Sequence, residues 1–156
     1  MLERISLASW HAWSMYPGAV SETTRGVVPA AMVELSDRVG VALIRQGFTA
    51  RHAVQAVDLV FDLAADSSRG AEEMDSLAQQ RAGAGRQGYE TGWAPPPGGD
   101  PRVLELRSEM VRAIREDPEA WFRGKLRIVL AGIQQELAPP DPPSTTTSPS
   151  RKRSTP

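Results

Sequence analysis

Three aspartates, Asp58, Asp62 and Asp66, form the acidic array of most chemical interest in this chain. Residues spaced four apart lie on one face of a helix. Such a row can line the polar side of a pocket or bridge to arginines across an interface. We favour a simpler interpretation, in which the row is the water-facing stripe of an otherwise buried helix. No companion base can be named, so a catalytic acid pair is not predicted.

The two histidines, His11 and His52, have no partner at ligand spacing on their own helices, and the sequence contains no cysteine. Zinc would require more nitrogen, sulfur or carboxylate ligands. The glycine-rich stretch 82–88 has no flanking strand and no lysine, so it does not resemble a phosphate-binding loop. We therefore expect no metal, no cofactor and no enzymatic activity. A small helical enzyme is the least favoured alternative, because no activated nucleophile or base pair can be identified.

Length and composition indicate one domain followed by a tail. The chain has 156 residues, is 40% hydrophobic and carries a net charge of −1. This near-neutral charge argues against general nucleic-acid binding. Residues 138–156 are rich in proline, serine and threonine and are expected to be disordered. Because no apolar run suits a signal peptide or a membrane span, we expect a cytoplasmic protein with no membrane partner.

The rest of the chain shows helical periodicity and no convincing strand, which predicts an all-α fold. Residues 82–99 are expected to form a long, mobile Gly/Pro loop within the domain 1–137. Residues 19–25 are compatible with a short helix, and 68–81 with a continuation of the helix before them. The main helices are expected at 2–16, 29–46, about 50 to at least 67, 101 to about 116, and 118–137.

Two of these helices are apolar on more sides than a surface helix needs. In the helix that follows Thr49, nearly every position outside the aspartate row is apolar. Such a helix must be buried on more than one side, either centrally or against a partner chain. The helix 118–137 has one face built on Phe122 and a second face with Trp121, Ile128 and small residues. Its interior glycines cost about 1 kcal/mol each, for which a close helix–helix approach is the usual compensation.

Several segments resemble a known family. They are Gly47-Phe48-Thr49-Ala50-Arg51-His52-Ala53 with Ala56, the turn Tyr16-Pro17-Gly18, and the pattern from Phe122 through Leu126 to Gly132-Ile133. Together they resemble the C-terminal regulatory domain of the tetracycline-repressor (TetR) family over about residues 2–137.

In that family, the domain binds a small apolar or amphipathic effector among its helices. It also forms a homodimer through a four-helix bundle. The resemblance implies that the helix beginning near Thr49 and the helix 118–137 are the two dimer helices. The expected interface residues are Val57, Phe61, Ala64, Phe122, Val129, Gly132 and Ile133.

A ligand pocket is expected among the helices that pack on this dimer core. Aromatic and methionine side chains suit an apolar ligand because they fill irregular shapes. Asp62 is the nearest candidate for a polar anchor, and Trp93 for a lid. Plain core packing is the favoured alternative for each wall residue. The candidate wall residues are Trp10, Trp13, Met32, Leu35, Phe61 and Met110.

The implied function is ligand sensing and homodimerisation in a TetR-type transcriptional regulator, whose repression a small-molecule effector relieves. The chain starts at the first helix of the regulatory domain, so the family's helix-turn-helix is not expected within it. DNA would be a partner only if the gene encodes that motif upstream. One alternative is a stand-alone effector-binding or heterodimerising helical module that does not bind DNA. Another is a purely structural helical dimer.

Overall fold

The computed structural model describes residues 1–16, 18–24, 26 and 28–139, and these residues form helices and connecting turns without any strand. The all-α prediction is therefore confirmed for this part of the chain. Of the expected disordered tail, residues 140–156 lie outside the described residues. The helices are α1 (Leu2–Met15), α2 (Ala19–Thr24), α3 (Ala30–Arg45), α4 (Ala50–Gln80), α5 (Arg86–Trp93), α6 (Pro101–Arg115) and α7 (Pro118–Glu136).

Side-chain caps fix where three of the helices begin. The side-chain oxygens of Thr49, Asp100 and Asp117 accept backbone N–H groups in the first turns of α4, α6 and α7, at 3.1, 2.8 and 2.9 Å. A proline follows each aspartate at the first helical position, where its missing N–H costs nothing. Gly47 follows the end of α3 with φ +97°, a conformation that favours glycine.

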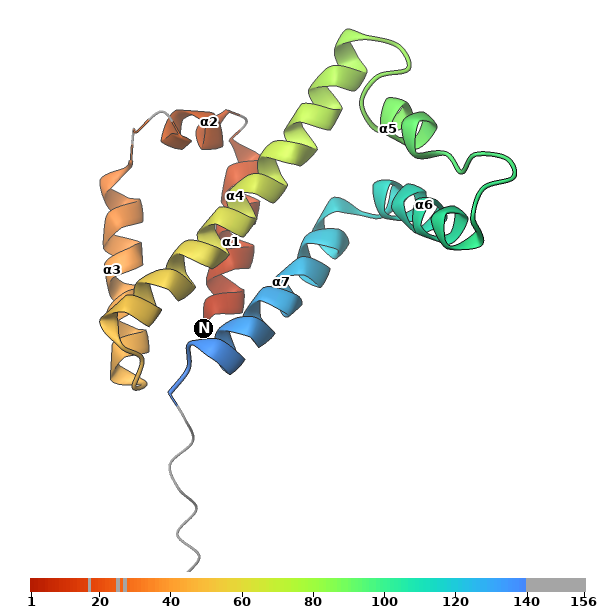
Figure 1. The fold of residues 1–156 in the computed structure, drawn as a ribbon. Helices are drawn as coiled ribbons and strands as arrows, with labels where there is room; N and C mark the ends of the chain where they lie inside the picture. Colours follow the sequence, from red (N-terminus) through yellow and green to blue (C-terminus); the bar gives the residue numbers. More distant parts are fainter. Residues whose placement is uncertain (17, 25, 27, 140–156) are drawn as a thin grey trace, which may run out of the picture.

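Helix α4 is the longest element, and α1 lies along it in the same direction (Figure 1). The Ser6 hydroxyl donates to the Val60 carbonyl at 3.0 Å, and the Gly18 N–H donates to the Glu72 carboxylate at 3.2 Å. Both bonds join residues 54 apart, so α1 and the segment after it follow α4 in parallel with a constant offset. The first of these bonds is buried, which satisfies the Ser6 hydroxyl inside the core.

Helix α7 runs antiparallel to α4 on another of its sides (Figure 1). The His52 ring donates from Nδ1 to the Leu137 carbonyl at 3.0 Å, which joins the start of α4 to the end of α7. Farther along, Lys125 Nζ donates to the Ser67 hydroxyl at 2.8 Å. Helix α3 also packs on α4, near its beginning. Helix α4 is therefore central, one of the two placements that its apolar circumference predicts.

The core lies between α4 and the helices α1, α3 and α7. The Phe122 ring stacks on Trp10 with 5.7 Å between ring centroids, and Trp13 meets the edge of Phe61 at 6.5 Å. The largest side chain that is completely buried is that of Phe122. Its neighbours in the core are Leu2, Trp10, Val39, Leu43, Ala53, Ala56, Val57, Val60, Phe61, Ala64, Leu126 and Ile133.

The expected loop 82–99 is only partly a loop, because Arg86–Trp93 forms helix α5. Contacts with α6 stabilise this helix despite its glycines. The Arg86 guanidinium donates to the Ile114 carbonyl at 2.8 Å, and Arg115 forms an ion pair of 2.8 Å with Glu90. Sequence reasoning weighted the glycines and could not see these tertiary contacts.

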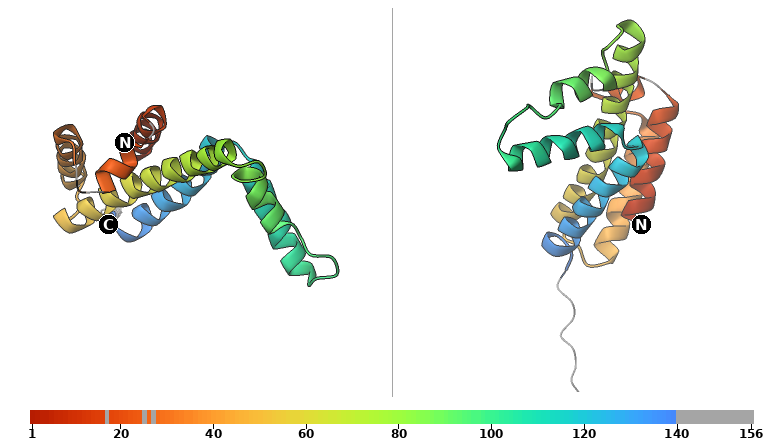
Figure 2. Two further views of the ribbon diagram at one scale, coloured as in Figure 1. Left: turned by 90° about the horizontal axis from the view of Figure 1, so that it is seen from above. Right: turned by 90° about the vertical axis from the view of Figure 1, so that its right-hand side faces the viewer.

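Helices α5 and α6 pack on each other and project from the end of α4 and the start of α7, away from the other helices (Figure 2). We call residues 86–115 the α5–α6 arm. Where the arm joins α4, the arm and the other helices meet at a corner. In the described part of the chain, no helix is long and apolar enough to cross a membrane.

Replacing Phe122 by alanine is expected to lower the free energy of unfolding by about 3–5 kcal/mol, since it opens a cavity beneath Trp10. Replacing its neighbour Trp121, which is 46% exposed, by alanine is expected to lower the free energy of unfolding by about 1 kcal/mol or less. Urea denaturation of both variants measures the difference. Equal losses of unfolding free energy in the two variants would contradict the finding that Phe122 is buried and Trp121 is exposed.

Candidate functional site

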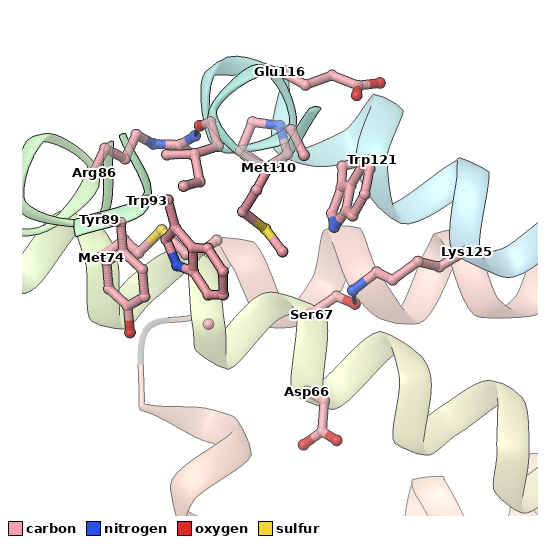
Figure 3. A pocket seen from close by; sticks show the side chains of 15 residues that line it. Asp66, Ser67, Met74, Arg86, Tyr89, Trp93, Met110, Glu116, Trp121 and Lys125 are labelled. Carbon is pink, nitrogen blue, oxygen red and sulfur yellow. Dashed lines mark hydrogen bonds between the residues drawn. The ribbon is translucent and has the colours of Figure 1, made fainter. Parts of the chain in front are cut away.

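A pocket lies in the corner between the second half of α4, the α5–α6 arm and the first turns of α7 (Figure 3). Its volume is about 380 Å³, within the range of roughly 300–1,000 Å³ that is usual for small-molecule sites. We call it the corner pocket. It is lined by Asp66, Ser67, Gly70, Ala71, Met74, Arg86, Tyr89, Trp93, Met110, Ala113, Ile114, Glu116, Pro118, Trp121 and Lys125.

Five aromatic and methionine side chains from four helices contribute to its wall. Met74 comes from α4, Tyr89 and Trp93 from α5, Met110 from α6 and Trp121 from α7, and their side chains surround a common space (Figure 3). All three aromatic rings are more than a third exposed, so the pocket presents apolar surface to water. A ligand with an apolar body would cover this surface and be stabilised by its burial.

Lys125 supplies a cationic group at the α4–α7 side of the pocket. Its ammonium donates to the Ser67 hydroxyl at 2.8 Å, and Figure 3 shows the side chain reaching along the pocket edge toward that residue. Partial burial lowers the pKa of Lys125, and the opposing effect of Asp66 is smaller. An ammonium that has lost part of its hydration gains from any ligand group that restores a charge-assisted hydrogen bond.

The structure distributes the sequence-predicted ligand residues over several places. Met110 and the proposed lid Trp93 do line the corner pocket. Trp10 and Trp13 instead pack on Phe122 and Phe61 in the core, as their favoured alternative interpretation stated. Met32, Phe61 and Asp62 line a separate groove of about 410 Å³ between α3 and α4. Leu35 lines another groove, of about 650 Å³, between α1 and α3. These residues do not form one pocket.

Sequence reasoning did not select Met74, Tyr89, Trp121 or Lys125 as ligand residues. Tyr89 lies in a helix that was expected to be a loop. Lys125 carried a signal that could have been used, because the sequence supplies its other positive charges almost entirely with arginine. An unusual lysine on an apolar helix face is a reasonable candidate for a binding group, since lysine is readily perturbed by burial.

The aspartate row proves to face water, as favoured from the sequence. Asp58, Asp62 and Asp66 are all exposed along α4. Partial burial raises the pKa of Asp62, and the negative charges of Asp58 and Asp66 raise it further. Asp66 pairs with Arg69 one turn later. The row therefore lies outside the core, and its carboxylates repel one another.

Both histidines bridge helices. His11 Nε2 lies 3.1 Å from the Glu119 carboxylate, which joins α1 to α7, and His52 joins α4 to the end of α7. The hydrogen bond from His11, followed by that from Arg123, lowers the pKa of Glu119. Among the residues that the structure describes, no three acidic or histidine side chains gather closely enough to hold a metal ion.

Most of the residues expected at a dimer interface are core residues of the single chain. That they contact a second chain stays a prediction. Their side chains have almost no surface left for a partner, because α1, α3 and α7 already enclose that side of α4. Val129 is half-buried against the same core, and Gly132 is exposed. The buried residues of this set are Val57, Phe61, Ala64, Phe122 and Ile133.

The second face of α7 is the one left open. Ile128 is 75% exposed, and Trp121 and Gly132 lie on the same side of the helix at spacings of seven and four residues. A Cβ atom added at Gly124 or Gly132 would meet nothing within 4 Å. We call Trp121, Gly124, Ile128, Ala131 and Gly132 the open α7 face.

Asp62→Asn is expected to raise the melting temperature at about pH 7. The raised pKa of Asp62 means that ionisation of this carboxyl costs more free energy in the folded than in the unfolded chain. The asparagine variant, which cannot ionise, is therefore more stable than the wild type at pH values where Asp62 is charged. The gain should shrink as the pH falls through the raised pKa and vanish below 3.8, where the aspartate is protonated in both states. Thermal melts from pH 7 to 3.5 measure it. The exposed Glu73→Gln on the same helix is the control, and a variant no more stable than wild type at pH 7 would contradict the prediction.

Comparison of the chain with models of protein families, with curated proteins and with solved structures finds no match.

Proposed function

We propose that this chain is a small-molecule-sensing, homodimerising regulatory domain of the TetR type. The observation that carries the proposal is the position of Trp121. Its side chain lines the corner pocket and also belongs to the open α7 face. A ligand that contacts this ring therefore acts on the same helix surface that a second copy of the chain would cover.

The open α7 face supports the dimer. It combines exposed Ile128 and Trp121 with glycines that allow another helix to approach closely. Isolated apolar residues on a surface need no explanation, but a row of them along one helix indicates an interaction surface. The glycines in this helix cost stability unless such an approach compensates for them. A second α7 from an identical chain would present the same small residues.

The corner pocket supports the sensing role. Its walls come from α4, from the α5–α6 arm and from α7, so a bound molecule would hold these elements in one arrangement. Ligands shift a protein toward the conformation that they bind best. In a complete regulator of this type, a helix-turn-helix unit encoded outside this chain would read DNA, and the ligand would alter the spacing of two such units. Transcriptional repression relieved by an effector would be the result.

Ile128→Asp is expected to convert a dimer into a monomer that still folds, as circular dichroism would show, because the residue is on the surface of the single chain. Leu106→Asp is the matched control, since Leu106 is 62% exposed on the α5–α6 arm. Sedimentation velocity over a range of protein concentrations measures both. A wild-type chain that is monomeric at about 100 µM, or an Ile128→Asp variant that stays dimeric, would contradict the proposed interface.

Trp93→Ala is expected to weaken binding of the neutral dye Nile red at least about tenfold, whereas Trp13→Ala should leave the affinity within about twofold. Trp93 lines the corner pocket, but Trp13 packs on Phe61 in the core. Dye fluorescence titrations measure the affinities, and circular dichroism confirms that both variants fold. The reverse order of effects would place the ligand among the core residues and contradict the corner pocket.

A further inference from the structure

Lys125 stands apart from the other charged groups of the corner pocket because no acidic group pairs with it. Among the described residues, no carboxylate oxygen lies within 4.0 Å of its ammonium, and Ser67 is its hydrogen-bond partner. A lysine ammonium has three N–H donors. The Ser67 hydroxyl accepts one of them, so two remain for another acceptor.

The two acidic residues of the lining do not serve as that acceptor. Asp66 pairs with Arg69, and Figure 3 shows its carboxylate pointing away from the space between the aromatic rings. The Glu116 side chain points outward from the opposite edge of the pocket (Figure 3). Both carboxylates nevertheless lie near the pocket and make its surroundings unfavourable for a ligand with two negative charges.

Arg86, the other cation of the lining, is already engaged. Its guanidinium donates to the Ile114 carbonyl at 2.8 Å and lies 4.0 Å from the Asp75 carboxylate. These contacts hold α5 against α6 and turn the guanidinium toward the backbone of α6 (Figure 3), whereas Lys125 lies at the α4–α7 edge of the pocket. Lys125 therefore presents its ammonium at the α4–α7 edge of a cavity whose other walls are mostly apolar.

We propose that the corner pocket binds an apolar carboxylic acid, with its carboxylate on Lys125 and its aromatic or aliphatic body between Trp93, Met110 and Trp121. The inference rests on the proposed function, since it names the class of ligand for that pocket. A carboxylate supplies one negative charge, which matches Lys125. A phosphate monoester carries about −1.5 to −2 at neutral pH and would exceed what the site compensates. A carboxylate also accepts two hydrogen bonds at one end and leaves the rest of the molecule apolar.

The test compares acids with alcohols of the same shape. Three matched pairs serve as probes: 2-naphthoic acid and 2-naphthalenemethanol, indole-3-acetic acid and indole-3-ethanol, decanoic acid and 1-decanol. Isothermal titration calorimetry of the full chain at pH 7.5 gives the affinities. For at least one pair we expect the acid to bind about tenfold or more tightly than the alcohol, as a charge-assisted hydrogen bond would provide.

Lys125→Met is expected to remove this preference, since it keeps the length of the side chain and deletes the charge. Lys125→Gln is a second neutral variant should the first one fold poorly. Arg127→Met is the matched control, because Arg127 is exposed two residues farther along α7, about 200° around the helix, and lies outside the lining. This control should bind the acid as the wild type does, whereas the two Lys125 variants should bind acid and alcohol alike.

The outcomes separate the ligand class from the function. If acid and alcohol bind the wild type equally, or if a folded Lys125 variant keeps the preference, the carboxylate assignment is overturned and the pocket stands. If no member of any pair binds, both the assignment and the proposed sensing function are overturned. A preference for the acid that disappears in the Lys125 variants and persists in Arg127→Met supports both.

Discussion

The burial of α4 between three other helices is the constraint on which this structure depends. Ala53, Ala56 and Ala64 are at most 1% exposed, and their small side chains allow the neighbouring helices to come close. A larger residue at any of these positions would separate helices whose side chains are packed at the density of a protein interior. The close approach also buries the Ser6 hydroxyl, which is satisfied because it donates to the Val60 carbonyl of α4.

The same packing explains why a pocket forms where it does. The constant offset of 54 residues brings the end of α1, at Met15, beside residue 69 of α4. Helix α4 continues to Gln80, so its last turns extend past the cover of α1. The arm and the first turns of α7 meet it there, at angles that leave space between side chains. The corner pocket lies along Asp66 to Met74 of α4, around the level at which α1 ends.

Sequence reasoning could predict the helices that depend on local signals, and it could identify the central one. The caps at Thr49, Asp100 and Asp117 are local, so their helices begin where expected. The site depends on long-range packing, which periodicity does not report. Trp121 and Phe122 are adjacent, yet one lines the pocket and the other is completely buried, because consecutive helical residues point about 100° apart.

The position of Trp121 links ligand binding to assembly in the proposed function. A group that takes part in both events couples them, and the coupling is reciprocal: if the ligand changes the dimer affinity by some factor, dimerisation changes the ligand affinity by the same factor. The α5–α6 arm could change position in this coupling, because it packs mainly on itself and on the end of α4. A molecule bound between Trp93 of the arm and Trp121 of α7 would fix the arm relative to the open α7 face. A regulator built this way needs no large rearrangement of its core, since Phe122 and the other residues of the central core do not line the pocket.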